Sequence, residues 1–229
     1  MSVTVQPLII ASRPPNASFF QESGNLAAGD LPFGWAQNVF TAALVAPLAV
    51  LGMRIGTFSD ASTGFEIFPV QHSQDNPNTV YKVFVFPVQL YNATINGADQ
   101  FVQATFFEQN ALTAGPAVLC TCDIGSSLNG YFFHKDGFVE RVNNNVVTDV
   151  NGVSFGAYAQ NDVVRMSVDI QATQNVFTIL KNGVLDATVT DNSVNRITVG
   201  CPGWIGFTTT GVVAAAHSRW KNFSAGAGA

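Results

Sequence analysis

The chain has 229 residues, of which 47% are hydrophobic and 11% are charged, and 19 of them are Phe. A chain of this length can bury about 70% of the surface that its unfolded form exposes, so its fold requires neither disulfides nor a metal. High hydrophobicity with low charge excludes a disordered protein. The 10 basic and 15 acidic residues include no basic cluster, which argues against nucleic acid as a partner.

The N-terminal segment lacks the features of a secretory signal, because no charge precedes Arg13 and two prolines follow it directly. The longest apolar stretch, from Val39 to Leu51, is 13 residues long. A membrane-spanning helix needs about 20 residues, so we expect no membrane insertion.

The chain divides into an arm, one domain and a tail. Residues 1–17 contain Pro7, Pro14 and Pro15, which oppose pairing inside a sheet, and predict an N-terminal arm. Residues 18–224 contain no interior linker and predict a single domain. Residues 225–229 are small and predict a flexible tail.

The dominant hydrophobic period is two, and no convincing amphipathic helix is present. Residues 64–70, 79–86 and 101–107 are apolar on both faces, as strands are when both of their faces are covered. From Asp162 to Ile170 apolar and polar residues alternate, which predicts a half-buried strand with one wet face.

The segment from Asn175 to Asp191 predicts a hairpin around Asn182-Gly183, a dipeptide that tolerates the positive φ angles of a two-residue turn. The expected register places three pairs on one face: Leu180 with Leu185, Thr178 with Ala187, and Val176 with Val189. The opposite face of the hairpin would then carry Phe177, Ile179, Asp186 and Thr188. Asn-Gly recurs at 96–97, 129–130, 151–152 and 182–183, and Asp-Gly occurs at 136–137. Turn dipeptides at this spacing predict an all-β sandwich or barrel.

Aromatic and glycine motifs follow one another in a definite order. They are Phe19-Phe20, Gly34-Trp35, Asp99 to Phe106, Ala117 to Cys122, Asn129 to Phe133, the Asn-Gly hairpin, Gly203 to Phe207, and Arg219 to Phe223. In this order they resemble the concanavalin A-like lectin/glucanase superfamily in its laminin-G-like form. The resemblance covers residues 18 to 224. It implies a two-sheet antiparallel β-sandwich of the jelly-roll type, whose final strand pairs back with the first.

Candidate catalytic residues are few. The glucanase branch of the superfamily uses a Glu-x-Asp-x-Glu strand, but Glu66, Glu108 and Glu140 each stand alone in this sequence. Residues Gly152 to Gly156 match Gly-x-Ser-x-Gly, with later acids and His217 in the order of a catalytic triad. That motif requires a strand-to-helix turn, and no helix is expected after Gly156. We therefore expect no enzyme.

Metal and cofactor sites are not predicted either. Cys120 and Cys122 lie on one face of an expected strand, but a metal would need two further soft ligands from a scattered set. The remaining candidates are Cys201, His72, His134 and His217. Buried thiols made in a reducing compartment explain three cysteines better.

Carbohydrate and calcium sites remain unassigned. Asp60 and Asp75-Asn76 lie in expected loops and have oxygens that suit calcium, yet isolated loop acids are usually solvated. Trp35, Trp204 and Trp220 lie in segments that the resemblance makes structural, so we expect them in the core rather than as sugar platforms. We assign no catalytic, cofactor-binding or metal-binding residue.

Two functional hypotheses remain. The first, which the resemblance implies, is a non-enzymatic virion structural or adhesion protein, such as a bacteriophage capsid-decoration, fibre or tail component. It would be made in the host cytoplasm and would contact itself as a homo-oligomer, other virion proteins and a host-surface glycan. The alternative is a cellular carbohydrate-binding module in an extracellular setting, and a hydrolase is third. Apolar faces at 79–86 and 101–107 and an arm that docks on a neighbour would drive self-association.

Overall fold

The computed structural model describes residues 19–22, 28–29, 31, 34–41, 52–68, 80–91, 99–109, 113–123, 127–209 and 218–228. The expected arm of residues 1–17 lies outside these ranges. The helix within them, α1 (Val88–Tyr91), has four residues. No helix in the described part of the chain has the length and hydropathy needed to cross a bilayer.

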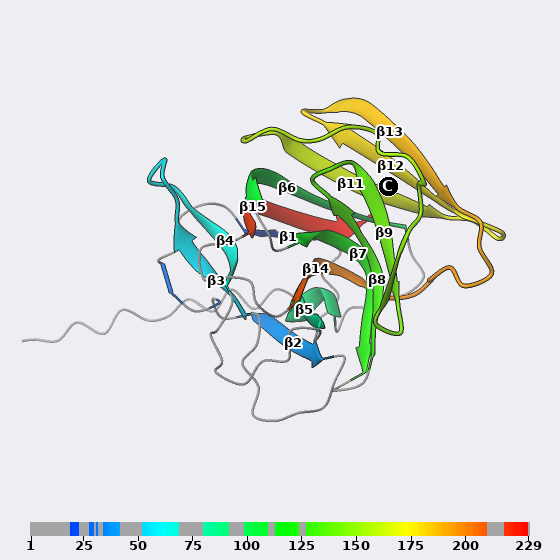
Figure 1. Ribbon diagram of the computed structural model, residues 1–229, viewed down its shortest axis with the longest axis horizontal. Helices are drawn as coiled ribbons and strands as arrows, with labels where there is room; N and C mark the ends of the chain where they lie inside the picture. The colour runs from blue at the N-terminus through cyan, green and yellow to red at the C-terminus, as the bar shows by residue number, and fades with distance from the viewer. Residues whose placement is uncertain are drawn as a thin grey trace, which may run out of the picture.

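The strands form two antiparallel sheets, which confirms the predicted two-sheet sandwich (Figure 1). In sheet A the strand order is β13-β12-β11-β6-β15-β4-β3, and β1 pairs with β15 beside this path. Its strands are β1 (Phe19–Glu22), β3 (Gly52–Thr57), β4 (Thr63–Phe68), β6 (Gln100–Gln109), β11 (Val163–Ile170), β12 (Asn175–Lys181), β13 (Val184–Asp191) and β15 (Ser218–Ala227).

Sheet B has the order β10-β9-β8-β7-β14-β5-β2. Its strands are β2 (Trp35–Thr41), β5 (Val80–Pro87), β7 (Thr113–Asp123), β8 (Ser127–His134), β9 (Phe138–Asn143), β10 (Val146–Asp149) and β14 (Cys201–Thr209). In Figure 1, sheet A runs from β13 and β12 through β11, β6 and β15 to the cyan β3–β4 hairpin.

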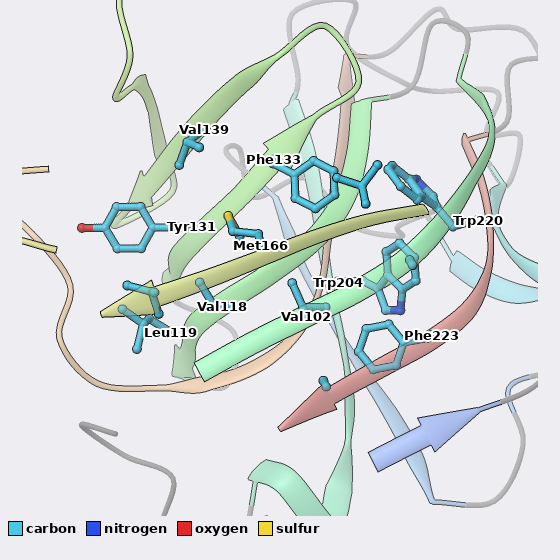
Figure 2. Packing of buried hydrophobic residues seen from close by; sticks show 14 of the residues in the cluster. Val102, Val118, Leu119, Tyr131, Phe133, Val139, Met166, Trp204, Trp220 and Phe223 are labelled. Atoms are coloured by element: carbon cyan, nitrogen blue, oxygen red, sulfur yellow. The ribbon is translucent and has the colours of Figure 1, made fainter. Parts of the chain in front are cut away.

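Aromatic rings from both sheets meet in the main core. Trp204 of sheet B lies 5.6 Å from Trp220 and 5.2 Å from Phe223, both of sheet A, between ring centroids. Phe133 of sheet B lies 5.6 Å from Trp220. Figure 2 shows these four rings at one end of the cluster and Tyr131 at the other. The packing therefore joins the sheets through face and edge contacts between rings.

The alternating strand predicted at 162–170 is confirmed as β11. Val164, Met166 and Val168 are fully buried in the main core, and the intervening Arg165 lies on the opposite face of sheet A. The period-two pattern therefore places the side chains of β11 on the correct faces, although the outward-facing Ser167 is itself largely covered, at 7% exposure.

The hairpin at 175–191 is confirmed, but most of its predicted register is wrong. Asn182 and Gly183 have φ angles of 52° and 80°, and Leu180 pairs with Leu185 as expected. Beyond that pair Ile179 lies opposite Ala187, so Asp186 is an extra residue in β13.

This β-bulge shifts the pairing by one residue and reverses which face turns inward. Val189 of β13 therefore points into the core, together with Phe177 and Ile179 of β12. The predicted pairs of Thr178 with Ala187 and Val176 with Val189 are absent, since these residues now pair with other partners.

The residues predicted as a flexible C-terminal tail, 225–229, lie partly in a strand. β15 continues to Ala227, and Ala225 is fully buried. Gly226 lies between two aromatic residues, Phe19 of β1 and Phe101 of β6. The small residues of this segment thus pair with strands on both sides, so the composition that suggested fraying is compatible with pairing. The pairing of β15 with β1 confirms the return of the final strand to the first.

One edge of sheet A is formed by β13, which pairs with β12 and with no other described strand. Val184 and Leu185 at its start are exposed, at 70% and 61% of their full surface. The bulge at Asp186 follows them directly. The open edge of the sheet therefore begins with apolar side chains and is interrupted one residue later.

Replacing Asn182-Gly183 by Val-Val should destabilise the domain by about 2–4 kcal/mol, since β-branched residues resist two consecutive positive φ angles. Thermal unfolding should show a melting temperature lower by roughly 5–15 °C. The exposed Leu185 provides a control, because Leu185→Thr should change the melting temperature little. An unchanged melting temperature in the turn variant would contradict the assignment.

Candidate functional site

The outer face of sheet A carries many polar side chains. Because the core-facing residues of β6, β11, β12 and β15 point inward, their neighbours point outward. We call this surface the polar face, and it consists of Glu66, Gln103, Thr105, Glu108, Arg165, Ser167, Thr178, Thr188, Arg219, Lys221 and Ser224.

Neutral hydrogen-bonding groups form rows across this face. Ser167 of β11 is the cross-strand partner of Thr178 in β12, and Thr178 is the partner of Thr188 in β13. In the next row Arg165 of β11 lies opposite Gln103 of β6, which is in turn opposite Ser224 of β15. Directly opposite residues in antiparallel strands have Cβ atoms about 4.5–5.5 Å apart, so each row places polar groups side by side. Ser167 and Ser224 are nearly covered, at 7% and 9% exposure, whereas Gln103, Arg165, Thr178 and Thr188 are at least partly exposed.

A charged group lies beside these rows on β4, β15 and β6. The Arg219 Nε atom lies 3.3 Å from Glu66 Oε2, and its Nη1 atom lies 3.8 Å from Glu108 Oε2. Glu66 is buried, and a Cβ atom on Gly56 would come within 2.5 Å of its carboxyl carbon. Glycine at position 56 therefore allows this carboxylate to lie across β3.

Glu108 reaches the polar face because of a second β-bulge. Arg219 pairs with Glu108, and the next residue of β15, Trp220, pairs with Phe106, so Phe107 is the extra residue. Strict alternation would have placed Glu108 on the core side with Phe106. The sequence separates the three glutamates, and the structure brings two of them together around one guanidinium.

This arrangement differs from a glycosidase centre. Such enzymes leave the space between their two carboxyl groups open for the glycosidic oxygen or a water molecule. Here the guanidinium of Arg219 occupies the space between Glu66 and Glu108. Glu140 belongs to β9 of the other sheet and does not join them.

Asp60 binds a lysine, and its oxygens are therefore occupied. Lys221 Nζ donates to Asp60 Oδ2, and the Ser62 backbone N–H donates to Asp60 Oδ1 at 3.0 Å. The hydrogen bond from Lys221, supported by those from Ser62, lowers the pKa of Asp60 to about 2. In the described ranges no group of three or more His, Cys, Asp or Glu side chains is placed to hold a metal. Asp75-Asn76, the other calcium candidate, lies outside the described residues.

Arg165 is the cation of the polar face whose guanidinium is available to a ligand. Its Cζ atom lies 3.9 Å from the centroid of the Phe101 ring, a cation–π contact that holds the side chain over β6. The other cations of this face, Arg219 and Lys221, are paired with carboxylates. Arg165 makes no hydrogen bond or ion pair with a described residue.

The serine of the Gly-x-Ser-x-Gly motif is part of a loop. Ser154 Oγ donates to the Asp136 carbonyl and accepts a bond from the Gly156 backbone N–H at 3.1 Å. The chain after Gly156 continues to β11 without a helix. The strand-to-helix turn that exposes a nucleophilic serine is therefore missing. His217, the expected third member of a triad, lies outside the described residues, as does His72.

The outer face of sheet B contrasts with the polar face, because it is apolar. Its buried cluster consists of Phe84, Phe86, Ala117, Cys120, Leu128, Phe132, Val142, Cys201 and Ile205. The expectation of buried thiols is confirmed for Cys120 and Cys201. The backbone of Cys122 lies in β7, and its side chain lies outside the described residues. The three tryptophans are buried in the main core, as expected.

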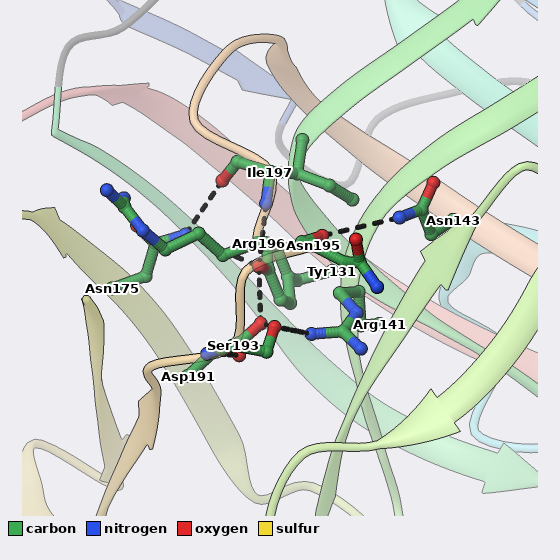
Figure 3. Close-up of polar contacts among 9 residues, drawn as sticks. All are labelled: Tyr131, Arg141, Asn143, Asn175, Asp191, Ser193, Asn195, Arg196 and Ile197. Carbon is green, nitrogen blue, oxygen red and sulfur yellow. Dashed lines mark hydrogen bonds and ion pairs between the residues drawn. The ribbon is translucent and has the colours of Figure 1, made fainter. Parts of the chain in front are cut away.

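A buried polar network fastens the segment between β13 and β14 (Figure 3). Tyr131 Oη donates to Asp191 Oδ2 at 2.7 Å and accepts from the Ile197 backbone N–H at 2.9 Å. Arg141 Nη1 donates to Asp191 Oδ2 at 2.8 Å, and Asn175 Nδ2 donates to the Ile197 carbonyl at 2.7 Å.

Burial, followed by the hydrogen bond to Asp191, raises the pKa of the Tyr131 phenol above its usual range. Burial alone would raise the pKa of Asp191, but hydrogen bonds from Tyr131, Ser193 and Arg141 lower it. The phenol thus stays protonated and donates to the ionised carboxylate. The network positions the backbone of the segment between β13 and β14 at Ile197.

Similarity to known proteins is confined to structure. No family model and no curated protein matches the chain. The solved structures that resemble it include β-glucanase of Bacillus licheniformis, with 14% identity, coverage of 93% of this chain and 99% of that one, and a TM-score of 0.49.

Two further similar structures are carbohydrate-binding modules. CBM66 from Bacillus subtilis has 11% identity, covers 85% of this chain and 96% of its own, and gives a TM-score of 0.46. The CBM2 module of the evolved Dit protein of Lactobacillus casei BL23 phage J-1 has 12% identity, coverage of 91% and 98%, and a TM-score of 0.42.

Glu140 is an isolated acid on the outer side of sheet B. It lies opposite Phe132 in β8 and Asp149 in β10, and its Oε2 atom is buried without a hydrogen bond. Burial, followed by the nearby charge of Asp149, raises the pKa of Glu140 to about 7. Its ionised form is therefore less stable in the folded protein than in the unfolded chain.

This raised pKa predicts a pH dependence of stability. The folded protein retains the Glu140 proton up to about pH 7, whereas the unfolded chain releases it near the ordinary value of 4.5. The stability that protonated Glu140 contributes to the folded protein is therefore fully present below about pH 4.5 and is lost as the pH rises to 7. At pH 8 the free energy of unfolding of Glu140→Gln should exceed that of the native protein by about 1 kcal/mol, measured by denaturant titration. Asp149→Asn should lower the pKa of Glu140, so that the loss of stability begins at lower pH. Equal stability of Glu140→Gln and the native protein at pH 8 would refute the prediction.

Proposed function

We propose that this chain is a non-enzymatic adhesion protein that binds glycan through the polar face of sheet A. The observation that supports this most directly is the set of hydroxyl and amide groups in rows on β6, β11, β12 and β13. Sugars offer hydroxyl groups that donate and accept, and Ser, Thr and Gln side chains can do both. A few polar groups fixed on a rigid scaffold are what orients such a ligand.

Arg165 supplies the charge-assisted hydrogen bonds of the proposed site. Its guanidinium is held by Phe101, lies opposite Gln103, and is two residues from Ser167 on the same strand. A charged donor that is already positioned loses less side-chain freedom on binding than a mobile one. Arg165 together with the partly exposed Gln103 and Thr178 therefore forms the centre of the proposed site, and the largely covered Ser167 lies between Arg165 and Thr178.

Two observations support a protein without catalytic activity. The carboxylates of Glu66 and Glu108 are separated by the Arg219 side chain. The hydroxyl of Ser154 is engaged within its own loop. Neither the Glu66–Glu108 pair nor Ser154 is therefore arranged as a catalytic centre.

The proposed setting is a virion, in which the chain acts as a capsid-decoration, fibre or tail component. The family resemblance and the low charge of the chain support it. Self-association needs an argument other than the apolar strands, because Phe84, Phe86, Phe101 and Phe107 are buried within the single chain. The arm at residues 1–17 remains the proposed contact with a neighbouring subunit or another virion protein.

The alternative is a cellular carbohydrate-binding module, for which the same polar face would serve. The two candidates differ in assembly. A virion component is expected as a homo-oligomer or bound to particles, whereas a module is expected as a monomer that binds sugar.

A glycan array followed by titration calorimetry tests the site. The native protein should bind at least one glycan, and Arg165→Gln should weaken that binding about 10-fold or more, as expected for a lost charge-assisted bond. Lys135→Gln is a matched control, because Lys135 pairs with Asp136 at the β8–β9 turn of the other sheet, and it should bind like the native protein. An array without signal would overturn the function, and normal affinity of Arg165→Gln would overturn the site.

Sedimentation of the full chain and of a variant without residues 1–15 tests assembly. The full chain should sediment as an oligomer at micromolar concentration, and the truncated chain should stay folded but associate less. Identical monomers in both samples would contradict the virion proposal and favour the module.

A further inference from the structure

Two buried cysteines lie directly opposite each other in sheet B. Cys120 of β7 and Cys201 of β14 are cross-strand partners in an antiparallel pair. Both belong to the apolar cluster on the outer face of the sheet, with 1% and 3% of their surface exposed. The two thiols therefore project from neighbouring strands to the same side.

The backbone spacing of such a pair suits a disulfide. Residues directly opposite in antiparallel strands have Cα atoms about 4.5–5.5 Å apart. Disulfides join residues whose Cα atoms are about 4.4–6.8 Å apart. No movement of the strands toward each other is needed to reach this range.

A buried amide holds the two strands together next to the cysteines. Gln100 Nε2 donates to the Gly200 carbonyl at 2.5 Å, and Gln100 Oε1 accepts from the Leu119 backbone N–H at 3.1 Å. Gly200 and Leu119 are the residues that precede Cys201 and Cys120. Gln100 is fully buried on the core side of sheet B, so its two hydrogen bonds fix the separation of β7 and β14 next to the cysteines.

The side chain of Cys120 has to turn before the bond can form. Its Sγ atom now lies 3.5 Å from the Val118 carbonyl and would be 2.7 Å from a Cβ atom placed on Gly130 of β8. It therefore points toward β8, on the side of β7 away from β14. A rotation about χ1, between staggered positions that are all ordinary for cysteine, brings it toward Cys201.

We propose that Cys120 and Cys201 form an intrachain disulfide that joins β7 to β14 when the protein meets an oxidant. With hydrogen peroxide, one thiolate attacks a peroxide oxygen and becomes a sulfenic acid, and the hydroxide that leaves takes up the proton released by the thiol to give water. The second thiolate then attacks that sulfur and displaces the hydroxyl group, which leaves as water after taking up a proton. Two thiols and one peroxide thus give one disulfide and two water molecules.

The bond should stabilise the folded protein, because it closes a long loop in the unfolded chain. It should form slowly, since both thiols are buried and local opening must precede the reaction. The inference is independent of glycan binding, because the cysteines lie on sheet B and the polar face lies on sheet A.

The test uses the full chain with Cys122→Ser, which leaves the two cysteines of interest. After long incubation with hydrogen peroxide or with oxidised glutathione, the denatured variant should show a loss of both titratable thiols and a mass lower by about 2 Da. Its melting temperature should rise by several degrees and return after reduction. The matched control, Cys122→Ser with Cys201→Ser, should show no such rise.

Peptide mapping of the oxidised native protein provides a second measurement if the variant fails to fold. A Cys120–Cys201 crosslinked peptide is expected. The proposal is overturned if both thiols persist, if the mass rises by added oxygen atoms instead, or if the crosslink joins Cys122 to either partner.

Discussion

The contact on which the rest of the structure depends is the one between Trp204 of sheet B and Trp220 of sheet A. Once Trp220 is fixed in the core, its neighbours on β15 must point outward. Those neighbours are Arg219 and Lys221, which bind Glu66 and Glu108 in one case and Asp60 in the other. The charged part of the polar face is thus a consequence of aromatic packing on the other side of the same strand.

The sequence was sufficient to predict a strand where apolar and polar residues alternate without a break, and a turn where the dipeptide itself favours positive φ angles. β11 could be predicted to within one residue, and the Asn182-Gly183 turn was predicted because few other dipeptides accept two positive φ angles. It failed at bulges, because Asp186 and Phe107 have no local mark that distinguishes them from ordinary strand residues. Each reverses the alternation beyond it, so the core face of β13 and the outward position of Glu108 could not be predicted.

The candidate site could not be predicted for a related reason. Glu66, Glu108 and Arg219 are distant in the chain and meet only because β4, β15 and β6 are neighbours in sheet A. The same holds for the Arg165 and Gln103 pair. Single residues such as Ser154 stood out in the sequence because they matched a motif, whereas a surface assembled by strand pairing has no such motif.

The bulge in β13 also bears on how the chain behaves at high concentration. An open edge strand presents backbone groups with which a second chain can continue the sheet, and Val184 to Asp191 is rich in residues that favour this. The extra residue breaks the even spacing of those groups, and the exposed carboxylate of Asp186 would have to lose its water. Asp186, the residue that interrupts the alternation in β13, therefore also opposes fibre growth from this edge. Ordered association is favoured at other surfaces of the molecule.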